Sequence, residues 1–457
     1  MAAFLDRAEQ VLRDTWGYPH FRFHQRRVVL AALGGRDCLA ILPTGGGKSL
    51  CFQVPALLLP GLTLVVSPLI SLMQDQVAAL RRRGIAAAYL SSTQTPETRS
   101  AVREALGAGR LKLLYVAPER LERLLGGARL PVSLLAVDEA HCISEWGHEF
   151  RPHYRAIGQH RTALGSPPTI ALTASATPAT RADIVRVLGL ARPVSVLQSF
   201  DRPNLTFAVH ACRDEPERVR LGVAKLRAAQ GTAIVYVPTR NRTDGVAAIL
   251  RRYGFPAAPY HAALPPGARR ALLGRFLDGS IRIMVATNAF GMGIDKPDVR
   301  LVLHLGIPSR PEAYYQEAGR AGRDGDPARC ELLWTKRDLV LMRRLAGGGP
   351  AAATGLETMR KYVHGWRCRR RVLLGYLGES IGRCAGCDRC GIPDAPQLTG
   401  LSGPPHAAYR LHAGSQSSNG RLGSETIRPV ATSTSSRPAP ARAMIQRRSG
   451  DQSRPSS

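Results

Sequence analysis

Short apolar runs alternate with longer, arginine-rich amphipathic stretches between residues 30 and 340, and they form two series. Such runs are typical of buried strands, and strands separated by helices predict parallel sheets with helices on both faces. The first series is "CLAIL" (38–42), "LTLVVS" (62–67), "LKLLYV" (111–116), "SLLAVD" (133–138) and "TIALTA" (169–174). The second is "TAIVYV" (232–237), "AAPYH" (257–261), "IRIMVAT" (281–287), "VRLVLHLG" (299–306) and "RCELLW" (329–334). The pattern predicts an α/β fold with two similar lobes.

Changes in composition divide the chain further. The predicted lobes are residues 1–198 and 199–340, and the segment "LQSFDRPNLTF" (197–207) reads as their connection. Residues 341–395 form a predicted small helical domain that holds a cluster of cysteines. Residues 396–457 are rich in Ser, Pro, Gly, Thr and Arg, so we expect them to form a disordered basic tail.

The charge of the chain favours a polyanionic partner. Its formal net charge is +29, and counterion release then favours nucleic acid. Biased codon usage is an equally good explanation, because Arg, Ala, Gly and Pro are all abundant. No apolar run is long enough to cross a bilayer, and "MAAFLDRAEQ" lacks the plan of a secretory signal. We therefore expect a cytoplasmic protein that does not bind membranes.

A glycine-rich stretch, "LPTGGGKSL" (42–50), follows the first predicted strand and precedes a helix. Consecutive glycines let backbone N–H groups point at phosphate oxygens, while the lysine reaches the β- and γ-phosphates and the serine hydroxyl binds Mg²⁺. Leu42 stands where the strict P-loop pattern has Gly, and a purely structural glycine turn is the alternative. The predicted nucleotide-binding residues here are Thr44, Gly45, Gly46, Gly47, Lys48 and Ser49.

Two further segments complete a predicted ATPase site. Asp138 and Glu139 end a predicted buried strand, where a P-loop enzyme needs a carboxylate for Mg²⁺ and a second one to orient water. In the second lobe, "YYQEAGRAGRDG" (314–325) contains Gln316, Arg320 and Arg323. The two arginines are three residues apart, so on a helical turn they face the same way and could act as arginine fingers.

Four of the nine cysteines lie close together in the sequence. Because the chain shows no export signal, their spacing indicates a metal site, and four thiolates suit one tetrahedral Zn²⁺. An iron–sulfur cluster and an unmetallated cluster are the alternatives. The predicted ligands are Cys368, Cys384, Cys387 and Cys390; the cysteines expected to be buried free thiols are Cys38, Cys51, Cys142, Cys212 and Cys330.

With these motifs in hand, the chain closely resembles the RecQ family of superfamily 2 DNA helicases from about residue 14 to residue 390. The resemblance implies tandem RecA-like lobes and a zinc-binding domain. "FRFHQ" (21–25) resembles the adenine-reading element, so Arg22 and Gln25 are carried over, although the family usually has Pro-Gly in place of Phe23-His24. "VVSPLISLMQDQV" (65–77) is similar to the family segment that contacts the DNA backbone, which assigns Ser71 and Gln74 to DNA.

The stretch "CISEWGHEFRPHY" (142–154) resembles the family's aromatic-rich loop, which senses single-stranded DNA. Aromatic stacking on bases is worth about 1–3 kcal/mol per base. Glu145 stands where the family more often has Gln, so a negative charge lies near the expected DNA path. The residues that the resemblance assigns to DNA in this loop are Trp146, His148, Phe150 and Arg151.

The resemblance implies an ATP-dependent 3′–5′ DNA helicase that uses ATP, Mg²⁺ and Zn²⁺, acts on single-stranded and forked DNA in recombination and repair, and works as a monomer. Because no winged-helix domain is recognisable after Cys390, a DNA-stimulated translocase with weak unwinding is the nearest alternative. An RNA helicase and a non-catalytic DNA-binding protein are more distant ones.

Overall fold

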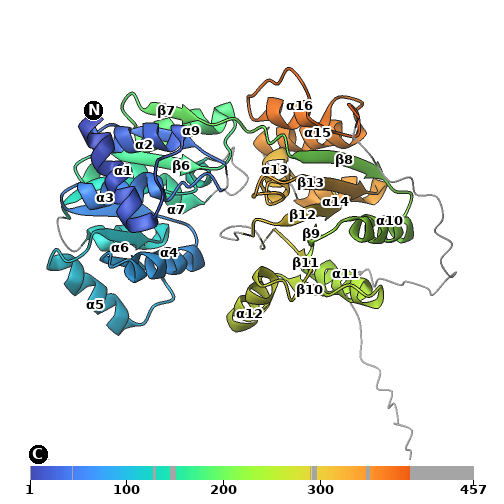
Figure 1. Cartoon of the computed structure of the whole chain (residues 1–457), viewed down its shortest axis with the longest axis horizontal. Coiled ribbons are helices and arrows are strands. Elements are labelled where there is room, and N and C mark those ends of the chain that lie inside the picture. Colours follow the sequence, from blue (N-terminus) through green and yellow to red (C-terminus); the bar gives the residue numbers. More distant parts are fainter. Residues whose placement is uncertain are drawn as a thin grey trace, which may run out of the picture. The chain divides into compact units, whose positions relative to one another are not determined.

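The computed structural model describes residues 2–43, 45–126, 130–144, 151–288, 290, 296–345 and 350–391, and it holds two parallel sheets covered by helices (Figure 1). The predicted tail (396–457) lies outside these residues. None of the helices in this part of the chain has the length and apolar character of a membrane span.

The first lobe contains a seven-stranded sheet in the order β3-β4-β2-β5-β6-β1-β7. Its strands are β1 (Cys38–Ile41), β2 (Leu62–Val66), β3 (Ala87–Leu90), β4 (Leu113–Val116), β5 (Val132–Val137), β6 (Thr169–Thr173) and β7 (Val194–Leu197). Its helices are α1 (Ala2–Trp16), α2 (Phe23–Leu33), α3 (Leu50–Leu58), α4 (Ile70–Arg82), α5 (Pro96–Gly107), α6 (Pro118–Leu125), the 3₁₀ helix η1 (Ala140–Ile143), α7 (Pro152–Arg155), α8 (Ile157–Ala163) and α9 (Pro178–Leu188).

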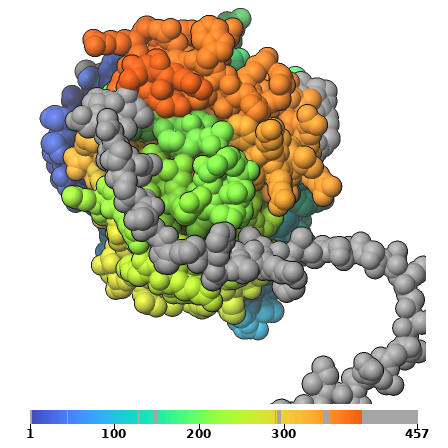
Figure 2. Space-filling model, turned by 90° about the vertical axis from the view of Figure 1, so that its right-hand side faces the viewer, coloured from blue at the N-terminus to red at the C-terminus, as the bar shows by residue number. Residues whose placement is uncertain are grey.

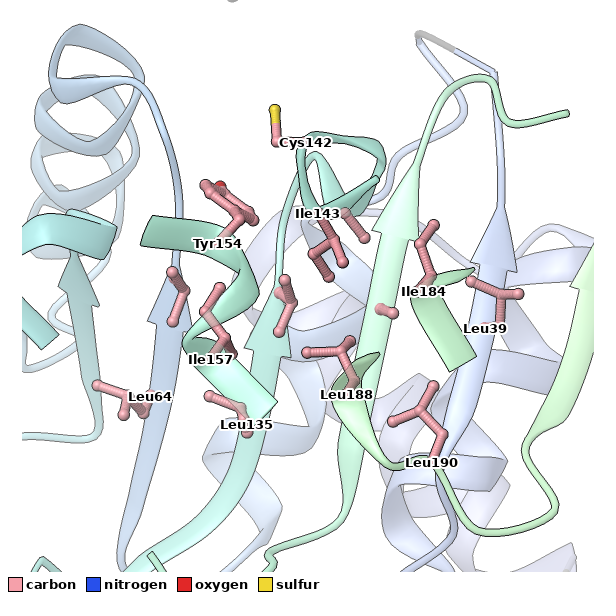
Figure 3. Close-up of a cluster of buried hydrophobic side chains, with 14 of the residues drawn as sticks. Leu39, Leu64, Leu135, Cys142, Ile143, Tyr154, Ile157, Ile184, Leu188 and Leu190 are labelled. Atoms are coloured by element: carbon pink, nitrogen blue, oxygen red, sulfur yellow. The ribbon is translucent and has the colours of Figure 1, made fainter. Parts of the chain in front are cut away.

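Both faces of this sheet are buried, because successive residues of each strand enter different apolar clusters. Leu39 on β1 joins a cluster with Ile157, Ile184 and Leu188 from helices α8 and α9 (Figure 3). The next residue, Ala40, joins a cluster built with α2, α3 and α4. The strands therefore read as continuous apolar runs, and the polar residues that follow them gather at the carboxyl edge of the sheet.

The second lobe contains a six-stranded parallel sheet in the order β10-β11-β9-β12-β13-β8. Its strands are β8 (Leu205–Ala211), β9 (Thr232–Tyr236), β10 (Ala257–Tyr260), β11 (Ile283–Ala286), β12 (Val299–Leu305) and β13 (Ala328–Trp334). Its helices are α10 (Glu215–Ala228), α11 (Arg240–Arg252), α12 (Pro266–Leu277), α13 (Pro311–Ala318) and α14 (Lys336–Leu345). The two predicted sheets are thus confirmed. Strands β3, β7 and β8 were not predicted, and the predicted connection 197–207 includes the last residue of β7 and the first three residues of β8.

Two further helices, α15 (Pro350–His364) and α16 (Arg369–Tyr376), lead to the cysteine cluster. Met359 and Leu373 from these helices share one apolar core with the second sheet. Beyond α16, Cys387 forms a parallel bridge with Phe207, and the Asp388 N–H donates to the Phe207 carbonyl oxygen over 3.0 Å. The cysteine segment therefore covers the outer edge of β8, which would otherwise be an open sheet edge. In Figure 2 the orange and red C-terminal residues adjoin the green part of the second lobe.

Candidate functional site

The glycine-rich loop joins β1 to α3 at the carboxyl edge of the first sheet. Gly45 and Gly47 have φ values of +80° and +70°, which are strained for any other residue. The loop closes through a 2.9 Å bond from Gly46 N to Pro43 O and a 3.2 Å bond from Leu50 N to Gly47 O. This geometry turns the loop into the amino terminus of α3, and the positive end of the helix dipole there favours an anion. The predicted Thr44 lies outside the described residues.

Arg22 and Gln25 hold this loop from the amino-terminal turn of α2. Arg22 donates to the carbonyl oxygen of Gly45 over 3.0 Å. The buried Gln25 donates to the carbonyl oxygens of Gly46 and Gly47 over 3.0 and 3.3 Å, and its own Oε1 accepts the backbone N–H of Arg22. The two residues predicted to read adenine therefore lie against the phosphate loop.

The predicted carboxylate pair follows β5. Asp138 N donates to Val66 O on the neighbouring strand, and Asp138 Oδ1 accepts the N–H of Glu139 over 3.0 Å. Glu139 has a φ of +48°, a left-handed conformation that turns the chain sharply into η1. Burial and the adjacent Glu139 raise the pKa of Asp138 to about 7, although Lys48 works in the opposite direction. A nearby cation would therefore stabilise the ionised form of Asp138. Lys48 Nζ itself donates to the Leu42 carbonyl oxygen over 3.3 Å.

A buried histidine joins the carboxylate pair to the next strand. His141 Nδ1 lies 2.8 Å from Thr173 Oγ1 and 3.3 Å from Glu139 Oε2. Burial opposes protonation of the ring, but Cys142 and Glu139 hold the pKa of His141 above its usual value. Thr173 Oγ1 also donates to the Ser175 carbonyl oxygen, and the Ser175 hydroxyl accepts from Gln316 Nε2 over 2.9 Å. The predicted Gln316 is thus connected to Glu139 through His141, Thr173 and Ser175.

Arg320 and Arg323 lie in the turn that follows α13, beyond the end of the helix. The turn begins with two backbone hydrogen bonds that each join residues three positions apart, from Arg320 N to Glu317 O and from Ala321 N to Ala318 O. Arg320 is 7% exposed and interacts with the hydroxyl group of Tyr236 at the end of β9. Arg323 is half-buried. A pair of arginines in one ordered turn can supply positive charge to a phosphate.

The residues assigned to DNA are only partly described. Ser71 and Gln74 are exposed on the first turns of α4, and Gln74 donates to the Tyr89 hydroxyl over 3.1 Å. Arg151 Nη1 donates to the Pro68 carbonyl oxygen over 3.0 Å, which places its guanidinium beside the segment that leads into α4. Trp146, His148 and Phe150 lie outside the described residues, as does Glu145.

The four clustered cysteines converge at the end of the described chain. Sulfur atoms of Cys368, Cys384, Cys387 and Cys390 all lie within 4.8 Å of one another, and the Gly386 N–H donates to Cys384 Sγ. The hydrogen bond of Cys390 to Cys368 raises the pKa of Cys390 to about 12. Four thiolates at this spacing would repel one another, and a bound cation would offset that repulsion. The donor set and its spacing fit tetrahedral Zn²⁺. The five scattered cysteines are buried and free, as predicted.

Three family models match the chain in order. A DEAD/DEAH box helicase model covers residues 22–184, a helicase conserved C-terminal domain model covers 218–325, and a RecQ zinc-binding model covers 337–391. The third model contains the four cysteines and favours zinc over the iron–sulfur alternative.

Curated relatives extend this likeness over most of the chain. The "ATP-dependent DNA helicase RecQ" of Haemophilus influenzae is 41% identical over 395 residues, which are 84% of this chain and 63% of that protein. The RecQ protein of Bacillus subtilis is 42% identical over 84% of this chain and 67% of its own length. The chain belongs to the RecQ family. The chain thus spans somewhat under two thirds of the length of the Haemophilus influenzae relative.

Solved structures agree on the fold. The helicase Lhr of Mycobacterium smegmatis, bound to single-stranded DNA and AMP-PNP, matches this RecQ-family chain with a TM-score of 0.58 at 22% identity, over 79% of this chain and 50% of that one. The DUF1998 helicase MrfA bound to DNA matches with a TM-score of 0.62 at 18% identity, over 74% and 52%. At these identities the likeness concerns the two-lobed fold alone.

Sequence reasoning missed several residues that complete the site. Thr173 lies in the predicted strand "TIALTA" and His141 lies two residues after Glu139, yet their roles depend on a contact between η1 and β6. Tyr154 donates from its hydroxyl to the Asp138 carbonyl oxygen over 3.0 Å and so fixes the start of the turn after β5. A polar residue within an apolar strand, such as Thr173 in "TIALTA", is the one signal that could have indicated such a partner.

Proposed function

We propose that the chain is an ATP-dependent DNA helicase, in which the glycine loop and the Asp138–Glu139 pair hydrolyse ATP and the chain moves along single-stranded DNA. The observation that carries the proposal is the convergence of Arg22, Gln25 and the loop 45–49 at one sheet edge with a carboxylate pair on a nearby strand. Membership of the RecQ family supports DNA as the substrate, because curated relatives carry the name ATP-dependent DNA helicase.

Within this proposal, loop N–H groups and Lys48 bind the phosphates, which releases Lys48 from the Leu42 carbonyl oxygen. Mg²⁺, held by Ser49 and Asp138, would supply charge neutralisation at the β- and γ-phosphates. Glu139 orients the attacking water, and its ion pair with His141 holds it in place. Arg22 and Gln25 lie on the loop side where they can also contact the base.

The second lobe contributes Gln316, Arg320 and Arg323. Arg320 and Arg323 neutralise the charge that develops on the transferred phosphoryl group, as arginine fingers do. Gln316 senses this step through its hydrogen bond to Ser175, which belongs to the His141–Thr173 network. Coupling between hydrolysis and movement would then pass through contacts of these few side chains.

Contacts to DNA are proposed for Ser71, Gln74 and Arg151, with Trp146, His148 and Phe150 as stacking or polar partners. Arg151 and the turn before α4 are already joined through Pro68, so DNA bound at α4 is well placed to influence the loop after η1. The net charge of +29 supports DNA, a polyanion, as the binding partner. On the basis of family membership, the same proposal includes movement in the 3′ to 5′ direction and action on forked DNA. It also includes a monomeric state, a cytoplasmic setting and a role in recombination and repair.

The test compares ATP hydrolysis with and without single-stranded DNA, alongside unwinding of a duplex with a 3′ overhang. We expect DNA to stimulate hydrolysis and Lys48→Ala to abolish it. Lys112→Ala is the matched control, because Lys112 also donates to a backbone carbonyl, that of Leu59, away from the site. Hydrolysis without any stimulation by DNA would overturn the proposal. Stimulation without unwinding would instead favour the translocase.

A further inference from the structure

The turn that carries Arg320 and Arg323 is held by side chains from the segment that precedes β8. Arg202 donates from Nη1 to the Gly319 carbonyl oxygen over 2.7 Å and from Nη2 to the Gly322 carbonyl oxygen. These two carbonyls flank Arg320, and Gly322 directly precedes Arg323. One planar guanidinium therefore fixes the backbone on both sides of the arginine pair.

A second side chain completes this clamp. Asn204 Nδ2 donates to the carbonyl oxygens of Gly322 and Asp326 over 2.8 and 2.9 Å. Gly322 has a φ of +52°, and a Cβ added there would lie 2.6 Å from Asn204 Nδ2 and 2.7 Å from the Asp326 carbonyl oxygen. No side chain fits at Gly322 between the turn and the groups that donate to it. The position of the turn relative to the segment 202–204 is therefore fixed.

The clamp is fixed in turn by a buried arginine of α16. Arg370 is 1% exposed and donates to the Arg202 carbonyl oxygen over 2.9 Å, and also to Asp201 and the Leu205 carbonyl oxygen. Its guanidinium lies 5.5 Å from the centre of the Phe207 ring. The groups that Arg370 contacts in this way all belong to residues 201–207. Arg370, two positions after Cys368 in the sequence, therefore fixes the position of Arg202.

Such a chain of contacts has a consequence for catalysis. A displacement of about 1 Å in a catalytic group can lower a rate about a hundredfold. Arg202 does not reach a phosphate itself in this arrangement, because both of its Nη atoms bind the turn. We infer that Arg202 is a positioning residue for Arg320 and Arg323, and that Arg370 holds Arg202 in place. The inference rests on the proposed ATP hydrolysis and adds two residues that no motif for the nucleotide site includes.

The first test is Arg202→Gln in the full chain. We expect kcat for DNA-stimulated ATP hydrolysis to fall at least about tenfold, while KM for ATP, the Kd for a single-stranded oligonucleotide and the melting temperature stay near those of the unchanged protein. Affinity for ADP with aluminium fluoride, which mimics the transferring phosphoryl group, should fall by a similar factor, whereas affinity for ADP alone should not change.

Arg282→Gln is the matched control. Arg282 lies in the same lobe and likewise donates to backbone carbonyls, those of Gly231 and Leu226 over 3.0 and 2.9 Å, and these acceptors lie outside the turn 319–326. A merely structural role for Arg202 predicts that both variants lose stability and keep kcat. If Arg202→Gln lowers the melting temperature as much as Arg282→Gln does and leaves kcat and the ADP–aluminium fluoride affinity unchanged, the inference is wrong.

Arg370→Lys tests the outer half of the chain. If the two arginines act in series, the double variant Arg202→Gln/Arg370→Lys should lower kcat no further than the stronger single variant, whereas independent effects would multiply. Multiplication would overturn the role given to Arg370. Arg320→Ala, measured in parallel, separates the proposed function from the inference. If the protein without substitutions does not hydrolyse ATP, the proposed function is wrong. If it hydrolyses ATP and Arg320→Ala lowers kcat but Arg202→Gln does not, only the inference is wrong.

Discussion

His141 Nδ1 lies 2.8 Å from the hydroxyl oxygen of Thr173, so the turn after β5 is tied to the end of β6 inside the first lobe. The same ring nitrogen is 3.3 Å from Glu139. The position of the proposed water-orienting carboxylate therefore depends on a residue 34 positions further along the sequence (173 − 139 = 34).

Thr173→Val removes the hydroxyl that holds His141 and leaves a side chain of similar shape. We expect kcat for ATP hydrolysis to fall about 3- to 30-fold with little change in nucleotide affinity, because the carboxylate pair keeps its place but Glu139 loses its fixed partner. Steady-state kinetics and ADP binding measure the two effects. Thr169→Val is the control: its hydroxyl, on the same buried strand, donates only to the Pro167 carbonyl oxygen. Equal effects of the two variants on kcat would contradict the role of the histidine contact.

Gly47→Ala changes the nucleotide loop at a point where both conformation and space are limiting. The φ of +70° is strained for alanine, and its Cβ would overlap the Gln25 amide. The loop or Gln25 must move, so we expect the affinity for ATP to fall at least about tenfold, as measured by calorimetry. Gly84→Ala has a similar φ of +75° with nothing within 4 Å of the added atom. It should cost about 1 kcal/mol of stability and leave ATP binding unchanged; loss of binding in both variants would show that strain alone is responsible.

The central strands could be predicted from sequence because both of their sides are buried. Strands β1, β2, β4, β5 and β6 of the first sheet, like β9, β11, β12 and β13 of the second, appear as runs of apolar residues. The three strands that the analysis missed, β3, β7 and β8, all lie at sheet edges. Their burial alternates or is interrupted, as in Val194–Leu197, where only Val196 is fully buried. Edge strands have one unpaired side and tolerate polar residues, so their sequences resemble loops.

For the candidate site, motifs indicated the residues at strand ends but not the contacts that hold them. The glycine loop, Asp138 and the cysteine cluster each form a short motif in the sequence. The glycine loop and Asp138 follow parallel strands, and the carboxyl ends of parallel strands lie at one edge of a sheet by geometry alone. Arg202 and Arg370, by contrast, act on residues more than 100 positions away in the chain. No local spacing records such a contact. Only the folded arrangement of β8, α13 and α16 reveals it.

Asp138→Asn tests the electrostatic strain at the nucleotide site. The pKa of Asp138 is raised from 3.8 to about 7, so folding favours the neutral acid. Stability from this group is complete below the unfolded pKa and is lost as pH rises through about 7. We therefore expect the nucleotide-free variant to unfold at higher denaturant than the unchanged protein at pH 8, by on the order of 1–4 kcal/mol, and to match it near pH 4. Asp75→Asn, which removes one carboxyl at an exposed position on α4, is the matched control for the loss of a charge. A gain that is equal at both pH values would contradict this account.

Cys387→Ser tests the metal and the structural role of the cysteine segment together. The unchanged protein should contain about one zinc ion per chain, and the variant should lose it because one of four ligands is replaced. Cys387 also forms the bridge that covers the edge of β8 through Phe207, so we expect the free energy of unfolding to fall by at least about 2 kcal/mol. Elemental analysis and denaturant unfolding measure these two quantities. Cys212→Ser replaces a buried free cysteine elsewhere in the lobe and should keep its zinc. A brown protein that contains iron, or a variant that keeps its zinc, would overturn the assignment.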